Sequence, residues 1–329
     1  MGIKFLNRYL KKHCNKGIEY NISLEKLKGK TIVVDTSIYI YKFLEENALL
    51  ENFFILITQF REYRITPLFI FDGKADASKM DLLWKRVLKK RDAWKEYEKL
   101  KETILDKSAN NNNKYVLDKM EICRKNSTRI KENDLIELKQ LFDAMGVFYY
   151  VATKEADVVC AYFVEKGFAW GCMSDDMDMF VYGCNFVLRE WNIHKKTGLL
   201  YDRNQIMKEL WMKPEYFSPV LLLMGSDYNQ EICKNEVISV QTAFKWYDEF
   251  MKHVIIGGRS PPDPKNKSSF YDWLENTKKI TPENNKKLQT ISDMYRVPES
   301  MDDHFVSSSS KKKTNINWTE LRKLLTAPA

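Results

Sequence analysis

Two short apolar runs near the start of the chain share one design: each is rich in β-branched or aromatic residues and ends in a carboxylate. These runs, Thr31–Asp35 and Pro67–Asp72, have the composition of buried parallel strands. Residues 37–64 lie between them and are long enough, and rich enough in Leu, Phe and Glu, for one or two crossover helices. The pattern predicts a β-α-β unit.

The alternation continues further along the chain. The runs Val147–Val151, Ala169–Met173 and Phe186–Leu188 predict three more strands, and Lys154–Lys166 has the amphipathic pattern of a helix that Gly167 ends. Strands that alternate with helices favour an α/β fold built on an open, mostly parallel sheet.

Residues 74–131 interrupt this alternation with a long insert. Apolar side chains recur there at helical spacing as far as Ile104, the stretch Asn110–Asn113 breaks the pattern, and a second helical run starts at Tyr115. The insert is therefore predicted to be two helices joined by a polar tip.

The insert also carries the charge of the chain. Between Lys79 and Lys131 there are sixteen Lys and Arg against eight Asp and Glu, an excess equal to the net charge of +8 of all 329 residues. Such asymmetry favours a polyanionic ligand. A solvated charged hairpin without function is the alternative, and a dense basic cluster argues against it: Lys85, Arg86, Lys89, Lys90 and Arg91.

Seven carboxylates stand in five clusters, each at or just beyond the end of an apolar run: Asp35, Asp72, Glu155 with Asp157, Asp176 with Asp178, and Asp227. Ligands of open α/β sheets bind at the carboxyl ends of the strands. Any one of these residues could equally cap a helix or form a turn. Five clusters together, two of them pairs of like charges that repel unless a cation neutralises them, indicate a metal site.

The chemistry that such a site supports is phosphodiester hydrolysis. Magnesium prefers carboxylate and water oxygens, and two ions ~3.5–4 Å apart can stabilise both the attacking and the leaving oxygen. The six cysteines are dispersed without a CxxC pair and there are only four histidines, a pattern that argues against zinc ligation and against a disulfide framework. The cysteines are therefore expected to be reduced and mostly buried.

Other classes of protein are disfavoured by what the sequence lacks. Its first residues do not form a signal peptide, Leu6 stands where a myristoylation signal needs Ser or Thr, and no apolar run approaches the ~18 residues that span a bilayer. We therefore expect a soluble intracellular protein that does not bind membranes.

Six ordered segments carry a resemblance to a known family: MGI, VVDTSIYIY, FDGKADASKMDLLWKR, KEADVVC, SDDMDMFVYG and LLLMGSDY. In this order and at these separations the chain resembles a flap endonuclease of the XPG family of 5′ nucleases, over about residues 1–250. The resemblance implies a PIN-like 5′-nuclease fold, with a twisted and mostly parallel sheet, flanking helices, a helical arch and a mainly helical C-terminal region.

The resemblance also implies a domain organisation and a cofactor. The nuclease domain would cover residues 1–250, with an N-terminal region at 1–105, the arch at about 74–131 and an internal region at about 132–250. A C-terminal helical region with a Ser/Lys-rich linker would cover 251–329. The seven carboxylates would hold two Mg²⁺ ions per subunit, with Mn²⁺ as the alternative ion.

The resemblance further implies roles for residues near the cut. Lys79 and Arg86 match basic residues at the base of the arch that reach the scissile phosphate. Tyr41 matches a residue that stacks on a base, although core packing is its simpler explanation. Gly2 matches an N-terminus that packs beside the DNA. Together with the arch cations, the expected DNA contacts are Gly2, Tyr41, Lys85, Lys89, Lys90 and Arg91.

The chain departs from the family pattern at two places. After GSDY the family has a Gly-rich helix–two-turn–helix that binds duplex DNA and a monovalent cation, whereas here the glycines are missing, although a helix beginning near Ser239 is still expected. The C-terminus has no recognisable motif for a sliding clamp. Residues 257–262 are predicted to be a loop, 307–313 a linker, and Trp318–Leu325 a helical piece that packs on the domain or binds a partner.

The leading interpretation is a monomeric Mg²⁺-dependent 5′ nuclease that cuts branched or flapped DNA during replication, repair or recombination. It is expected in the nucleus, or at a site of viral DNA replication. Two alternatives stay open: a ribonuclease of the PIN-like fold, against which the long basic arch argues, and a DNA-binding scaffold with a silent site, against which the complete set of carboxylates argues.

Overall fold

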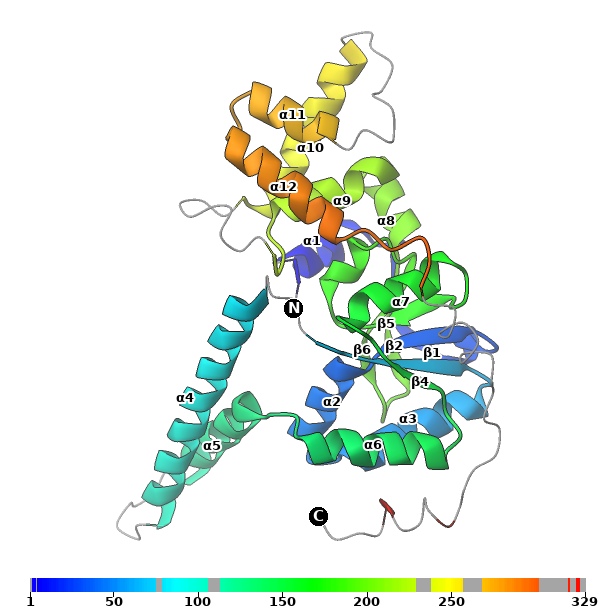
Figure 1. The fold of residues 1–329 in the computed structure, drawn as a ribbon, viewed down its shortest axis with the longest axis vertical. Helices are drawn as coiled ribbons and strands as arrows, with labels where there is room; N and C mark the ends of the chain where they lie inside the picture. Colours follow the sequence, from blue (N-terminus) through cyan, green and yellow to red (C-terminus); the bar gives the residue numbers. More distant parts are fainter. Residues whose placement is uncertain are drawn as a thin grey trace.

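The computed structural model describes residues 2–3, 5–74, 79–105, 113–228, 238–256 and 268–301, together with 319, 324 and 325. Within these residues the chain forms a seven-stranded sheet with the order β1-β7-β6-β5-β2-β3-β4 (Figure 1). Neighbouring strands from β6 to β4 are all parallel, while β7 lies antiparallel to both β1 and β6. The strands are β1 Ile18–Ser23, β2 Thr31–Asp35, β3 Thr66–Phe71, β4 Tyr149–Val151, β5 Gly171–Met173, β6 Phe186–Asn192 and β7 Thr197–Asp202.

Helices cover both faces of the sheet. The face that carries Ile32, Val34 and Phe69 packs on α2 Thr36–Glu45, α3 Leu49–Glu62 and α6 Glu132–Ala144. The opposite face, with Val33 and Ile70, packs on α7 Ala156–Glu165 and on the elements around it. Because successive strand residues point to opposite faces, one short apolar run supplies both cores. The remaining helices of the body are α1 Leu6–His13, α8 Arg203–Glu209 and α9 Pro214–Leu223.

The parallel part of the sheet follows the sequence pattern closely. Strand β2 has the predicted bounds, β3 begins one residue earlier than predicted and ends just before Asp72, and two crossover helices fill the interval between them. The antiparallel strands β1 and β7 were not predicted. Their mixed sequences, IEYNIS and TGLLYD, lack a continuous apolar run because they lie at one side of the sheet, where β1 is an edge strand with exposed positions.

The arch consists of two helices, α4 Met80–Leu105 and α5 Asn113–Ser127, which confirms the predicted pair; their connection at 106–112 lies outside the described residues. The helices run side by side and project away from the body (Figure 1). At 26 residues, α4 is roughly 39 Å long. Lys119 of α5 forms an exposed ion pair with Glu96 of α4 at 2.8 Å, which places the two helices in direct contact.

The described chain after Asp227 is mainly helical, which confirms the expected helical C-terminal region. It forms α10 Val240–Ile256, α11 Ser268–Asn276 and α12 Pro282–Met294, all of which pack against α9. Helix α10 continues through residue 250, where the sequence placed the end of the nuclease domain. The predicted loop at 257–262 and linker at 307–313 lie outside the described residues.

The C-terminal helical piece and the character of the helices complete the description of the fold. Of the predicted helical piece Trp318–Leu325, the structure describes Thr319, Leu324 and Leu325, and the two leucines pack against the core to which α3 and α6 contribute. No helix in the described ranges has the length and apolar character needed to cross a membrane.

Candidate metal centre and nucleic-acid interface

The elements around the carboxyl edge of the parallel strands place all seven carboxylates in one region. Asp35 is the last residue of β2, and Asp72 follows β3 directly. Glu155 and Asp157 stand at the first turn of α7, and Asp227 follows α9. Asp176 caps the short 3₁₀ helix η3 Met177–Phe180, which contains Asp178.

The charges of these side chains act on one another. Burial, and then the charge of Asp72, raise the pKa of Asp35 well above its ordinary value. The pKa of Asp157 is raised by burial and then by Asp35 and Asp176. Burial and then Asp176 raise the pKa of Asp178 to about 8, and Asp227 adds to this shift. Six carboxylates therefore repel one another in one region, where Asp35, Asp176 and Asp178 are buried, Asp157 and Asp227 are partly buried and Asp72 is exposed.

Hydrogen bonds hold the carboxylates in place. The Ser174 hydroxyl donates to Asp35 at 3.0 Å, and the Ala156 amide donates to Asp72 at 2.8 Å. The Asp178 amide donates to Asp176 at 2.9 Å. The other buried oxygen of Asp178, Oδ1, has no hydrogen-bond partner among the described residues, so one hard oxygen donor of the cluster is left available.

Two cations from the base of the arch reach into the cluster. The Lys79 ammonium lies 2.9 Å from a Glu155 oxygen and 4.0 Å from Asp227, and the Arg86 guanidinium lies 3.0 Å from Asp227. Although burial lowers the pKa of Lys79, the hydrogen bond and charge of Glu155 raise it above the ordinary lysine value. Lys79 is therefore a permanent cation beside the carboxylates.

The donor set fits hard divalent cations. Among the described residues no three carboxylate, His or Cys side chains are grouped so that they could hold an ion as they stand, and Lys79 and Arg86 neutralise Glu155 and Asp227 instead. A Mg²⁺ or Mn²⁺ ion would give the unpartnered Asp178 oxygen a ligand bond and would neutralise the mutual repulsion of the carboxylates.

Gly2 lies against the same carboxylates. A Cβ atom on Gly2 would overlap the Asp176 carboxylate and approach Asp178 Oδ1 to 2.5 Å, and the backbone has a φ of 76°. Only glycine tolerates both the conformation and the close approach. The start of the chain is thus packed beside the candidate metal centre, and its contact with DNA stays a prediction.

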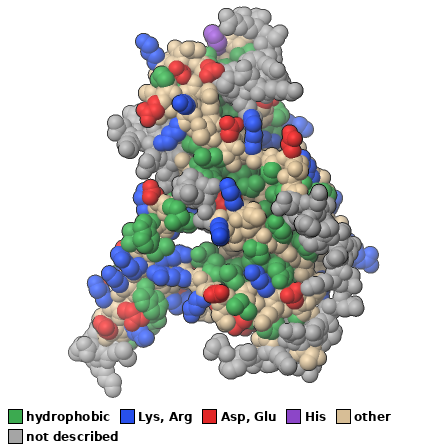
Figure 2. All heavy atoms as spheres, viewed as in Figure 1, with side chains coloured by type: hydrophobic (Ala, Val, Ile, Leu, Met, Phe, Trp, Pro, Cys, Tyr) green, Lys and Arg blue, Asp and Glu red, His purple; other side chains and the backbone are tan. Residues whose placement is uncertain are grey.

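The other expected DNA contacts lie on or near α4. Lys90 places its ammonium 3.9 Å from the centre of the half-buried Tyr41 ring, which joins α2 to the arch. Lys85, Lys89 and Arg91 are exposed on α4. Figure 2 shows Lys and Arg side chains gathered along the arch, with apolar side chains between them. This arrangement of cations and aromatic rings suits a nucleic-acid strand.

Two tyrosines at the centre were missed by the sequence interpretation. Tyr228 donates to Glu155 at 2.8 Å, and its ring lies 4.4 Å beneath the Lys79 ammonium. Its position directly after Asp227, in the LLLMGSDY segment, was the available signal. Tyr295 donates to Asp178 and comes from the end of α12, for which the sequence offered no signal.

The cysteines are consistent with the sequence expectation. Cys14, Cys160, Cys172 and Cys184 are buried and free, and Cys123 is free and partly buried; Cys233 lies outside the described residues. The segment after GSDY, residues 229–237, also lies outside them, whereas the expected helix near Ser239 is α10, whose first turn is capped by the Ser239 hydroxyl accepting from the Thr242 amide at 3.0 Å.

Comparison of the structure with solved structures defines the class of fold. The catalytic core of Rad2 in complex with DNA substrate is similar over 98% of this chain and 94% of that chain, with a TM-score of 0.62 and 20% identity. Flap endonuclease-1 from Methanococcus jannaschii covers 98% of this chain and 96% of its own, with a TM-score of 0.56 and 19% identity. The fold is that of the PIN-like 5′ nucleases.

Sequence comparison gives the family. The XPG N-terminal domain matches residues 1–93 and the XPG I-region matches residues 146–227, which together make just over half of the chain. The chain therefore belongs to the XPG family of nucleases. Flap endonuclease 1 of Meyerozyma guilliermondii is 27% identical over 268 residues, covering 76% of this chain and 68% of the relative. Probable RAD2-like endonuclease 369L of Invertebrate iridescent virus 6 is 26% identical over 327 residues, covering 81% and 75%.

Proposed function

We propose that this chain is a Mg²⁺-dependent, structure-specific nuclease that hydrolyses DNA phosphodiesters at 5′ flaps, nicks or gaps. The observation that carries the proposal is that seven acidic side chains lie in one region with the two cations at the base of a basic arch. The relatives named flap endonuclease 1 and the DNA-bound Rad2 core support DNA as the ligand. We assign its biological setting to replication, repair or recombination, in the nucleus or at a site of viral DNA replication.

The residues of the chain have distinct tasks in this proposal. Asp35, Asp72, Glu155, Asp157, Asp176, Asp178 and Asp227 would hold two Mg²⁺ ions, or Mn²⁺, directly or through water. Bound there, the ions would supply Lewis-acid stabilisation of the phosphate and activation of a water nucleophile. Lys79 and Arg86 lie where they can exchange a carboxylate partner for the scissile phosphate and oppose the negative charge that develops on it.

The arch and the N-terminus would position the substrate. Lys85, Lys89, Lys90 and Arg91 would bind the phosphate backbone, and Tyr41, already covered by Lys90, offers an aromatic face for an unpaired base. Gly2 keeps the start of the chain close to the carboxylates, where a side chain would displace Asp176 or Asp178. We propose that the protein acts as a monomer, and the sequence offers no support for tethering to a sliding clamp.

The direct test is cleavage of 5′-labelled single-flap, nicked and purely single-stranded DNA, with matched RNA, in Mg²⁺ and in EDTA. We expect Mg²⁺-dependent cutting at the flap junction. Cutting of the RNA but not of the DNA would favour the PIN-like ribonuclease, whereas binding without cutting of any substrate would favour the silent scaffold.

The arch makes a separate prediction about DNA binding. Changing Lys85, Lys89, Lys90 and Arg91 to Ala should flatten the dependence of log K on log salt, by roughly 0.7–0.9 for each phosphate that the variant no longer neutralises. The measurement is fluorescence anisotropy of flap DNA in Ca²⁺ over a salt series. A quadruple variant of exposed lysines outside the arch, Lys26, Lys28, Lys286 and Lys287 to Ala, changes the net charge equally and should keep the original slope. Equal slopes for the arch variant and the wild type would remove the arch from the DNA interface.

A further inference from the structure

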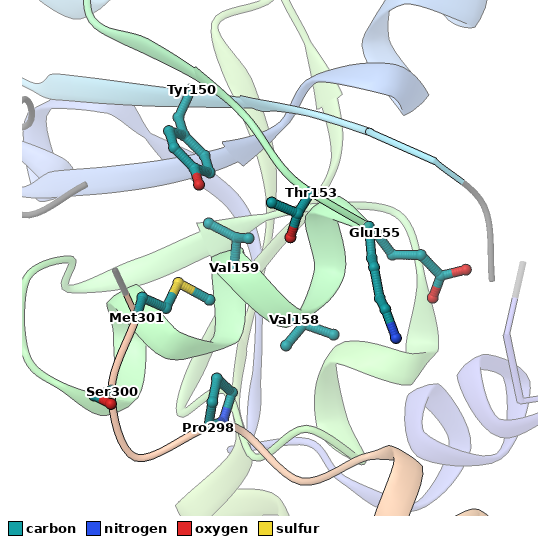
Figure 3. A pocket seen from close by; sticks show the side chains of 9 residues that line it. Tyr150, Thr153, Glu155, Val158, Val159, Pro298, Ser300 and Met301 are labelled. Atoms are coloured by element: carbon teal, nitrogen blue, oxygen red, sulfur yellow. The ribbon is translucent and has the colours of Figure 1, made fainter. Parts of the chain in front are cut away.

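The chain after α12 returns to the metal centre. Residues 295–301, here called the strap, run from the end of α12 across the body, and Val297 and Met301 of the strap pack against the main core. Figure 3 shows Pro298 and Met301 across a pocket of about 500 Å³ from Val158 and Val159 of α7. Glu155 lines the same pocket. A part of the chain beyond both matched family regions therefore adjoins the candidate site.

The first residue of the strap, Tyr295, contacts the acidic cluster directly. The hydroxyl of Tyr295, which is 5% exposed, donates a hydrogen bond to Asp178 Oδ2. Ser226, the residue before Asp227, also hydrogen-bonds to the Tyr295 side chain. One phenol thus links the segment that carries Asp178 to the segment that carries Asp227.

The packing around Tyr295 leaves its ring little freedom. Its centre lies 4.8 Å from that of Tyr182 and 5.4 Å from that of Tyr228, to which it is perpendicular. Helix α12 is itself anchored, because Asn285 donates to Asp272 of α11 at 3.0 Å. A phenol held in this way fixes the Asp178 carboxylate, with Oδ2 engaged and Oδ1 left without a partner among the described residues.

We propose that Tyr295 is a positioning residue for the metal centre: by holding Oδ2 of Asp178 it presents Oδ1 to a divalent cation, and it couples the C-terminal helices to that site. This inference rests on the proposed function, because it takes Asp178 to be a metal ligand. Partners that orient a metal ligand contribute substantially to affinity, and their loss typically weakens metal binding by about 10–100-fold.

The test compares two tyrosines of the C-terminal helices. Tyr295→Phe removes the hydroxyl that donates to Asp178, while Tyr271→Phe removes a hydroxyl of another buried tyrosine, which donates to the Pro219 carbonyl at 3.0 Å. Binding of Mn²⁺ is measured by electron paramagnetic resonance of the free ion, without DNA, together with the Mg²⁺ concentration that gives half-maximal cleavage. We expect Tyr295→Phe to weaken Mn²⁺ binding by about 10–100-fold and to regain turnover at high Mg²⁺, and Tyr271→Phe to bind Mn²⁺ within about twofold of wild type.

The outcomes separate this inference from the function on which it rests. If the wild type binds Mn²⁺ and cuts DNA but Tyr295→Phe binds the ion as tightly, the positioning role is wrong and the nuclease stands. If both tyrosine variants lose affinity alike, the effect is one of folding and the positioning role is again wrong. A wild type that neither binds Mn²⁺ nor cuts DNA overturns the metal centre and the inference together.

A double variant tests whether Tyr295 affects metal binding through Asp178. If Tyr295 acts through Asp178, then Asp178→Asn combined with Tyr295→Phe should bind Mn²⁺ no more weakly than Asp178→Asn alone. Additive losses would show that Tyr295 affects the site by another route and would contradict the proposal.

Discussion

Replacing Asp178 by Asn is expected to lower the turnover of flap DNA by several orders of magnitude while leaving DNA binding in Ca²⁺ largely intact. Asp178 Oδ1 is a buried hard donor without a hydrogen-bond partner among the described residues, and the charges of Asp176 and Asp227 act on the same carboxyl. An amide has nearly the same shape and can still accept the Tyr295 hydrogen bond, but it carries no charge for the cation. The measurement is single-turnover cleavage in Mg²⁺ beside anisotropy in Ca²⁺. Near-normal turnover would refute the assignment of Asp178 to the metal centre.

The stability of this variant provides the control for folding. Burial and the charge of Asp176 raise the pKa of Asp178 to about 8, above its value in the unfolded chain, so the folded protein binds that proton more tightly. The resulting stabilisation is present below about pH 4 and is lost as the pH rises toward 8. Asn does not titrate, so in EDTA at pH 8 the variant should unfold at a temperature at least as high as the wild type. A lower melting temperature would assign lost activity to misfolding.

The sequence predicted the parallel half of the fold because its signal there is local. Each of β2 and β3 is a short apolar run that ends at a carboxylate, and the chain must place these ends at one edge of the sheet. The antiparallel strands β1 and β7 give a weaker signal, since an edge strand and its neighbour mix polar and apolar residues. The helical packing of α10, α11 and α12 on α9 depends on tertiary contacts that no local pattern contains.

The same distinction separates the parts of the site. The seven acidic positions could be found one by one because each follows an apolar run, and the structure brings them together; their metal-binding role stays a prediction. Tyr295 could not be found in this way, because a lone tyrosine after a helix is ordinary in sequence and acquires meaning only from its contact with Asp178, 117 residues away. Lys79 and Arg86 are intermediate, since the family resemblance pointed to both residues but their ion pairs with Glu155 and Asp227 could not be read from the sequence.

Removal of the two cations at the arch base is expected to slow chemistry more than it weakens binding. Lys79→Ala and Arg86→Ala should each lower the single-turnover rate by about 10²–10³-fold, the loss typical of one preorganised group that opposes transition-state charge. Lys79 is 8% exposed and its pKa is raised by Glu155 above the ordinary lysine value, so it stays charged over the working pH range. The rate is measured at saturating enzyme, where weaker substrate binding cannot mimic slower chemistry.

A matched arch variant distinguishes this role from a general loss of positive charge. Lys119→Ala removes an equal charge from the arch, at an ion pair with Glu96 rather than at the acidic cluster, and should leave the single-turnover rate within about twofold, since an exposed pair contributes little. If Lys119→Ala slows cutting as much as Lys79→Ala, the arch acts through its overall charge. If only the Lys79 and Arg86 variants cut more slowly, these two residues act through their position beside the carboxylates and not through the overall charge of the arch.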